Sequence, residues 1–147
     1  MNSDILNFIQ KQKTASVCTV DEEYNPYCFS CYYAFDPVNA LLFYKTHGAS
    51  RHASLMLKKT EVAGTILPEK SIPLVVKGVQ FEGIVLSSDH PLAKEASKTY
   101  HLKYPFALTL PGVIWVIQLR HIKMTDSTKG FGAKIEWSFE EFAATHA

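Results

Sequence analysis

The sequence lacks a long hydrophobic run, an excess of one charge and a secretory signal. No apolar run approaches the roughly 18–20 residues that span a bilayer, and no positive segment followed by an apolar one begins the chain. Fifteen Lys and Arg face fourteen Asp and Glu without a block of like charge, which argues against nucleic acid or a membrane as partner. We therefore expect a soluble, cytoplasmic protein.

Cysteine is also scarce. The chain has three, an odd number in a sequence long enough to form a core, which does not indicate a disulfide framework. Cys28 and Cys31 form a C-x-x-C pair, but they lie in a strand-like run, where residues three apart point to opposite faces. A redox or zinc pair would need a turn or a helix start. We interpret both as buried structural thiols and expect no metal site.

The composition is that of a globular protein, with 47% hydrophobic and 20% charged residues. A chain of 147 residues fits a single domain, 1–147, and we expect its low-signal tail, 138–147, to be frayed.

Apolar periodicity and turn residues predict a mainly β chain of the α+β class, a small antiparallel barrel of six or seven strands with two or three helices. Gly78 and Gly83 within one long strand indicate a bulge, a bend or the close approach of another backbone, and Arg120-His121 indicates a bend between two strands. Ser3, Ser50 and Asp89 are the expected helix caps. The predicted helices are 3–12, 51–59 and one that ends before Pro105; the predicted strands are 14–20, 27–35, 40–46, 61–67, 74–86, 113–119, 122–126 and a short one within 129–137.

The stretch FYKTHGASRHASLM, residues 43–56, joins a strand to a helix with an unusual set of polar residues. The first N–H groups of a helix have no partner within it and carry partial positive charge. With the Ser50 and Thr46 hydroxyls and the Arg51 guanidinium beside them, this corner suits a phosphate. A capped helix with a solvated arginine would give the same pattern, so the motif alone leaves both interpretations open.

The same residues resemble a known phosphate loop. Thr46, three residues and then Ser50-Arg51-His52 are similar to the Thr, three variable residues and Ser-Arg-Lys of the pyridoxamine 5'-phosphate oxidase family. The segment VKGVQFEG (76–83) is similar to that family's mid-chain strand, and the likeness runs from about Thr14 to Asp126. Together with TDSTKGFGAK, it resembles a small bacterial branch of these flavoproteins. The resemblance implies a split β-barrel that binds FMN at the interface of a homodimer.

The resemblance also implies site residues. Gln80 would meet the edge of the flavin ring, with Gly78 and Glu82 on its face, unless it is an ordinary exposed strand residue. The face of Cys28, Ser30 and Tyr32 is the favoured flavin side, and Trp115 is either a core residue or a stacking partner. The expected FMN-binding residues are Thr46, Ser50, Arg51, His52, Gln80, Ser30, Cys31, Tyr32 and Trp115.

Several positions depart from the oxidase pattern. Cys28 and Tyr33 stand where the oxidases carry a phosphate-binding Arg and a Lys, His52 replaces the Lys of Ser-Arg-Lys, and Gly78 replaces a Gln. The C-terminal Arg-x-His that holds pyridoxal phosphate has no counterpart. We therefore expect a flavin pocket without a vitamin B6 site, and a weaker hold on the phosphate.

The resulting hypothesis is an FMN-binding oxidoreductase-like protein that acts on an unknown small molecule. No catalytic residue is assigned, because the chain has no G-x-S-x-G elbow and no cluster with metal-ligand spacing. The alternative is a non-catalytic carrier or sensor of flavin or haem, with His47, His52 or His121 as a conceivable axial ligand.

Overall fold

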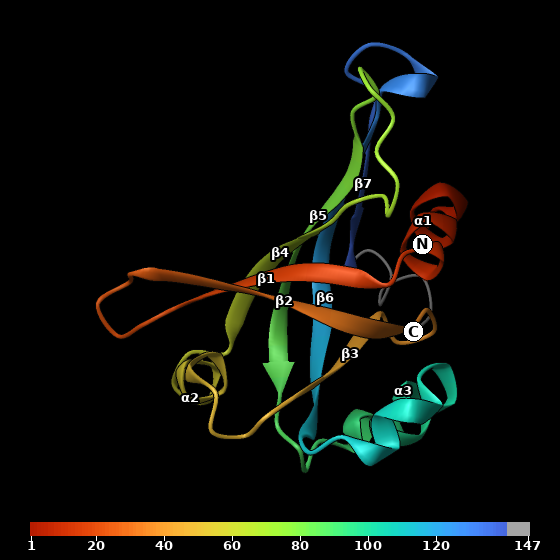
Figure 1. Ribbon diagram of the computed structural model, residues 1–147. Helices are drawn as coiled ribbons and strands as arrows, with labels where there is room; N and C mark the ends of the chain where they lie inside the picture. The colour runs from red at the N-terminus through yellow and green to blue at the C-terminus, as the bar shows by residue number, and fades with distance from the viewer. Residues whose placement is uncertain (141–147) are drawn as a thin grey trace.

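A closed barrel of six antiparallel strands forms the centre of the molecule (Figure 1). The computed structural model describes residues 1–140. The strands follow one another around the barrel in the order β3-β2-β1-β4-β5-β6, β3 pairs with β6 to close it, and β7 extends the sheet beyond β6. This confirms the predicted mainly β barrel of the α+β class. The strands are β1 (Thr14–Val20), β2 (Pro26–Asp36), β3 (Leu41–Thr46), β4 (Glu61–Ile66), β5 (Lys77–Leu86), β6 (Val113–Asp126) and β7 (Lys134–Ser138).

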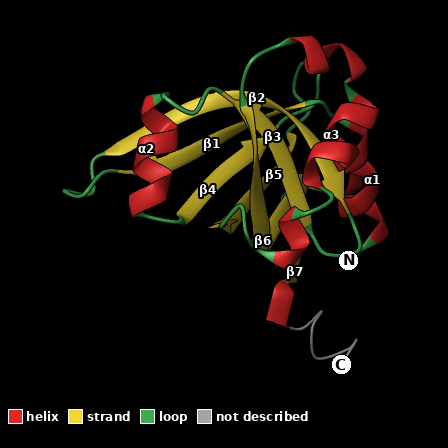
Figure 2. Cartoon of the chain, turned by 90° about the horizontal axis from the view of Figure 1, so that it is seen from below, coloured by secondary structure: helices red, strands yellow, loops and turns green. Residues whose placement is uncertain are grey.

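Three α-helices cover the barrel in the part of the chain that the structure describes. Helix α1 buries Ile5 and Ile9 in the barrel core, and α2 buries Met56 in the same core. Figure 2 shows α2 on the opposite side of the barrel from α1 and α3. The helices are α1 (Ser3–Lys11), α2 (Arg51–Lys58) and α3 (Ala96–Lys103), with short 3-10 segments at Pro91–Ala93, Pro105–Thr109 and Ser127–Lys129.

Strand β3 is buried on both faces. Leu42 and Tyr44 belong to the barrel core, whereas Leu41 and Phe43 belong to a second cluster that contains Tyr100 of α3. Burial on both faces explains why this strand reads as a continuous apolar run rather than an alternating one.

Two predicted helix caps were wrong by one residue. Asn2, not Ser3, is the last extended residue before α1, and its Oδ1 accepts a hydrogen bond from the Asp4 N–H at 2.8 Å. His90, not Asp89, holds the same position before the 3-10 segment that begins the third helical region. The third predicted cap, Ser50, is confirmed, because its Oγ accepts from the Ala53 N–H at 3.3 Å.

Arg120 does not separate two strands, as we expected, but lies within the single strand β6. Glu82 of β5 pairs with His121, and the next residue, Gly83, pairs with Leu119, so that Arg120 is the extra residue of a β-bulge. The bulge bends the strand and lets one long element serve both the barrel and the pairing with β7.

Gly83 is a position of close backbone approach, one of the alternatives that the sequence left open. A Cβ there would lie 2.8 Å from the Gln118 carbonyl oxygen of the neighbouring strand. The start of this strand was predicted too early: β5 begins at Lys77 rather than at residue 74, because Leu74 has a positive φ of 66° in a turn.

The cysteines overturn one expectation. Cys18 and Cys28 are directly opposite each other on β1 and β2 and form a disulfide with a Cα–Cα distance of 4.1 Å, so Cys28 is not a buried thiol. Cys31 is a free thiol that packs against the barrel core, and burial raises its pKa to about 12. The two cysteines do point to opposite faces of β2, as their spacing requires.

Among residues 1–140, no helix has both the length and the apolar character needed to cross a membrane. The expected frayed tail, 138–147, lies outside the described residues except for its first three, and Ser138 ends β7.

Candidate functional site

The barrel wall opens between β2 and β3. The last four residues of β2, Tyr33 to Asp36, pair with β3, but the preceding residues pair only with β1. The end of β3, Lys45 and Thr46, pairs only with β6. Figure 1 shows the two strands diverging, with α2 below the β1–β2 hairpin. One backbone edge of β2 therefore has no strand beside it.

A cavity of about 420 Å³ lies at this opening. Its walls are the unpaired part of β2, the end of β3, the first turn of α2, α3 and the segment before β6. This cavity is called the cleft below. Its lining residues are Phe29, Ser30, Cys31, Tyr32, Lys45, Thr46, His47, His52, Tyr100, Phe106, Ala107, Leu110 and Pro111.

Thr46, Ser50 and His52 form one hydrogen-bonded cluster at the α2 end of the cleft. The His52 Nε2 lies 2.7 Å from the Thr46 Oγ1 and 3.1 Å from the Ser50 Oγ, and the two hydroxyl oxygens are 3.5 Å apart. Ser50 caps α2 through the Ala53 N–H. In the described part of the chain, the N–H groups of Arg51 and His52 have no acceptor. The cluster therefore offers two hydroxyls and the free helix N–H groups as hydrogen-bond donors for an anion, with the His52 imidazole beside the hydroxyls.

His52 is held in place by stacking on Phe29. The ring centroids are 3.8 Å apart and the planes are 12° from parallel. Burial lowers the pKa of His52 below its usual 6.5, so the imidazole is neutral at pH 7. A neutral ring with Nε2–H donates to the Thr46 Oγ1 and leaves that hydroxyl's own proton for a ligand.

The lowered pKa of His52 predicts a pH-dependent loss of stability. Because the pKa of His52 is lower in the folded chain than in the unfolded chain, the unfolded chain binds this proton first as the pH falls. The free energy of unfolding should therefore decrease from pH 6.5 down to the folded-state pKa. Urea denaturation at pH 7.5, 6.0 and 5.0 should show a shallower decrease in a His52→Gln variant than in the parent. His47→Gln, at an exposed loop position, serves as the control and should keep the parental decrease. Equal pH profiles for His52→Gln and the parent would refute the burial argument.

Lys45 brings a fixed cation to the cleft. Its Nζ donates to the Ala107 carbonyl at 2.7 Å and lies 3.3 Å from the His101 Nε2. The His101 Nδ1 lies 2.8 Å from the Ser97 carbonyl oxygen, which only a protonated Nδ1 can contact favourably, so Nε2 is left to accept from Lys45. These contacts tie the ammonium to α3 and to the segment before β6.

The structure brings several residues of the predicted site together. Thr46, His52, Ser30, Cys31 and Tyr32 line the cleft, and Ser50 contacts two of them from behind.

Three other predicted site residues lie elsewhere. Arg51 is exposed, with its guanidinium 4.9 Å from the centroid of the Tyr27 ring. Gln80 faces a separate groove on the outside of β5 and β6. Trp115 packs against the barrel core, and its buried indole N–H has no acceptor among residues 1–140.

The positions that depart from the oxidase pattern have structural roles in this chain. Cys28 forms the disulfide to Cys18. Tyr33 is buried in the core and donates its hydroxyl to the Ile9 carbonyl of α1 at 2.6 Å. Neither side chain lines the cleft, so neither replaces the missing cations.

Sequence reasoning missed Phe29, Lys45 and the whole segment 106–111. The sequence could have indicated Lys45, because this charged residue interrupts the apolar run of a strand immediately before Thr46. The segment 106–111 had none, because it is brought to the cleft from sixty residues away along the chain. Among the residues that the structure describes, no group of three or more His, Cys, Asp or Glu could hold a metal ion.

A six-stranded antiparallel barrel in which two neighbouring strands, β2 and β3, diverge at one end, with a helix N-terminus at the opening, is a split β-barrel fold. More particularly, the chain belongs to the UPF0306 family. It is 33% identical over 136 residues to a UPF0306 protein of Serratia proteamaculans, covering 91% of this chain and 92% of that protein. A UPF0306 protein of Salmonella schwarzengrund is 34% identical over 130 residues, 88% of each chain. No protein-family model matches the chain.

Solved structures share the fold at low sequence identity. A haem-binding protein of Mycobacterium smegmatis is similar with a TM-score of 0.75 and 14% identity, over 93% of this chain and 57% of that chain. An FAD-binding protein of Mesorhizobium loti has a TM-score of 0.67 and 14% identity, over 86% of this chain and 95% of that chain. A general stress protein 26-related protein of Clostridium acetobutylicum, of the pyridoxinephosphate oxidase family, has a TM-score of 0.65 and 12% identity, over 94% of each chain.

Proposed function

We propose that the cleft binds FMN and that the chain is a flavin-dependent oxidoreductase acting on a small molecule. The observation that carries the proposal is the Thr46–Ser50–His52 cluster at one end of an otherwise largely apolar cleft. A phosphate group and a flat aromatic ring on one ligand match these two parts. Proteins that share the fold include one named as FAD-binding and one of the pyridoxinephosphate oxidase family, which supports a flavin.

The phosphate fits the donors at the start of α2. The Thr46 and Ser50 hydroxyls and the free N–H groups of Arg51 and His52 would donate to its oxygens, and the helix dipole favours the negative charge. Arg51, whose guanidinium lies over the Tyr27 ring outside the cleft, would add only a more distant positive charge at the start of the helix. Because the oxidases' further Arg and Lys are absent, we expect the affinity for FMN to be moderate and the cofactor to be lost during purification.

The ring system fits between β2 and the segment before β6. The unpaired edge of β2, from Phe29 to Tyr32, offers backbone donors and acceptors to a polar ring edge, and Phe106 and Tyr100 add apolar surface. When bound, the flavin would supply the redox chemistry. The ammonium of Lys45 would stabilise negative charge on the ligand, and its contacts with Ala107 and His101 fix its position.

We also propose that a second copy of the chain covers the cleft. Three large apolar side chains line the cleft and are more than half exposed: Tyr32, Phe106 and Leu110. An exposed apolar cluster of this kind is typical of a protein–protein contact surface. Light scattering should give a mass of about twice the 16.5 kDa of one chain. A monomer that binds FMN tightly would contradict this arrangement.

Titration of the purified full chain with FMN tests the function directly. We expect quenching of flavin fluorescence with one FMN per chain, and bleaching of the bound flavin's absorbance when a reduced nicotinamide donor is added. Binding without bleaching by any donor would favour a flavin carrier over an oxidoreductase.

A haem-binding protein is the second candidate. The exposed His47 lines the cleft, and its Nδ1 accepts from the Ala49 N–H, which leaves Nε2 as a possible axial ligand. The haem-binding protein of M. smegmatis shares the fold. A chain that ignores FMN but gives a Soret band with haem, lost in a His47→Ala variant, would favour this candidate. His121 lies in the outer groove beside Glu136 and is not available to the cleft.

A further inference from the structure

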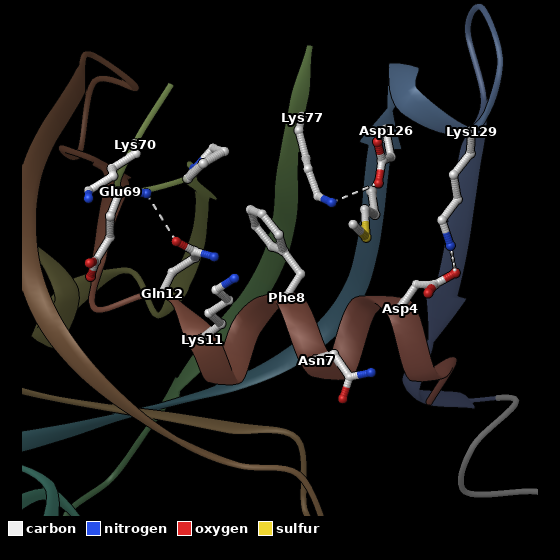
Figure 3. A pocket seen from close by; sticks show the side chains of 12 residues that line it. Asp4, Asn7, Phe8, Lys11, Gln12, Glu69, Lys70, Lys77, Asp126 and Lys129 are labelled. Carbon is white, nitrogen blue, oxygen red and sulfur yellow. Dashed lines mark hydrogen bonds and ion pairs between the residues drawn. The ribbon is translucent and has the colours of Figure 1, made fainter. Parts of the chain in front are cut away.

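A second pocket, of about 550 Å³, lies between α1 and the β5–β6 wall (Figure 3). Helix α1 forms one side, the loop after β4 forms one end, and β5 and β6 form the back. None of its lining residues lines the cleft. It is called the α1 pocket below.

The acidic side chains of the α1 pocket are all neutralised within the molecule. The most buried of them, Asp126, is 3% exposed, and its hydrogen bond with Lys77 lowers its pKa to about 2. The three ion pairs are Asp126–Lys77 at 2.9 Å, Glu69–Lys13 at 3.7 Å and Asp4–Lys129. The pocket therefore presents no unpaired carboxylate to a ligand.

Three donors at one end of the same pocket are unused. Lys11 and Lys70 have no ion pair or hydrogen bond in the described part of the chain. Gln12 is only 6% exposed; its Oε1 accepts from the Glu69 N–H at 3.0 Å, but its side-chain NH₂ has no acceptor within residues 1–140. Figure 3 shows the Lys11 ammonium and the Gln12 NH₂ at the same end of the pocket, near the segment of Glu69 and Lys70. Because its oxygen is fixed by the Glu69 N–H, the Gln12 side-chain NH₂ is held in place as a hydrogen-bond donor for a ligand in the pocket.

The floor of the pocket is apolar. Phe8 and Met124 are 6% and 2% exposed and belong to the barrel core. The Lys77 Nζ, which is ion-paired with Asp126, lies 5.9 Å from the centre of the Phe8 ring, so the ring has an apolar environment with a neutralised ion pair at its edge. Such a floor suits the flat apolar body of a ligand whose charged group reaches the unused donors.

We propose that the α1 pocket binds a small organic anion with an aromatic or similarly flat body. The body lies against Phe8, and the carboxylate or other oxyanion is held by Lys11, Lys70 and the Gln12 NH₂. The proposal does not depend on the flavin function, because the two sites share no residue and the pocket can be tested with or without FMN.

Amide NMR of the ¹⁵N-labelled full chain tests the proposal with benzoate as probe and benzyl alcohol as its uncharged match. Benzoate should shift the amides of α1 and of residues 69–70 in a saturable way, and benzyl alcohol should bind at least tenfold more weakly. Equal binding of both probes, or benzoate shifts confined to the cleft residues, would overturn the proposal.

Matched variants locate the anion. Lys11→Gln with Lys70→Gln should raise the dissociation constant of benzoate at least tenfold. The control variant, Lys94→Gln with Lys134→Gln, removes the same charge from exposed positions outside the pocket. Its dissociation constant for benzoate should stay within twofold of the parent's. Gln12→Glu keeps an acceptor for the Glu69 N–H but removes the donor and should also weaken binding at least tenfold. The same spectra show whether each variant is folded, and unchanged affinity in the folded Lys11, Lys70 variant would disprove the assignment.

Discussion

A Thr46→Val, Ser50→Ala double variant should bind FMN at least ~100-fold more weakly than the parent chain. Each hydroxyl would donate to a charged phosphate, a hydrogen bond worth about 1.5–3 kcal/mol, and 1.4 kcal/mol corresponds to a tenfold change in affinity. Riboflavin, which lacks the phosphate, provides the internal reference. The parent should prefer FMN over riboflavin, and the double variant should lose most of that preference while riboflavin affinity changes little.

Two further variants separate phosphate binding from helix stability. Ser50→Asp keeps a good cap for α2 but places a negative charge at the proposed phosphate position, so FMN binding should fall while the melting temperature is kept. Ser54→Ala with Thr60→Val makes the same kinds of change at exposed positions within and just after the helix, and should bind FMN within about twofold of the parent. If the Thr46, Ser50 variant retained the parental ratio of FMN to riboflavin affinity, the cluster would not be the phosphate site.

The local part of the candidate site could be predicted because its geometry is set within seven residues. Thr46 ends a strand, Ser50 caps the next helix, and His52 lies two residues further on, so the chain has little freedom to keep their side chains apart. The barrel class could be predicted for a related reason, since short strands and turn residues each leave a local pattern.

The rest of the cleft depends on contacts that local patterns do not encode. The alternation along β5 correctly places Gln80 and Glu82 on one face, but nothing in the strand shows that this face lies outside the barrel and away from the cleft. Lys45 becomes a site residue only because Ala107 and His101 are folded against it from a distant segment.

The Cys18–Cys28 disulfide could have been predicted from the hairpin, but the C-x-x-C spacing drew attention to Cys28 and Cys31 instead. Asp21 and Asn25 bound the turn of the first hairpin, and positions equidistant from its centre are opposite each other on β1 and β2. Cys18 and Cys28 are such a pair, whereas Cys31 is opposite Ala15. Register across a hairpin, rather than spacing along one strand, decides which thiols meet.

Replacing both bridged cysteines, Cys18→Ser with Cys28→Ser, should lower the free energy of unfolding by about 3 kcal/mol. The bridge closes a loop with a sequence separation of 10, and removing it restores the freedom of that loop in the unfolded chain. For a chain of this size, each kcal/mol shifts the melting temperature by about 2–4 °C, so a decrease of roughly 6–12 °C is expected. Because Phe29 adjoins Cys28 and supports His52, FMN affinity should fall as well.

Reduction of the parent chain with dithiothreitol should produce the same decrease, and reduction of the double variant should produce none. Thiol counting in denaturant supplies the independent check: the unreduced chain should show one reactive thiol, Cys31, and the reduced chain three. In the native state Cys31 should react slowly, because burial raises its pKa to about 12 and keeps it protonated. Three thiols in the unreduced, unfolded chain would show that Cys18 and Cys28 are not bridged, and the stability of the hairpin would then have to come from strand pairing alone.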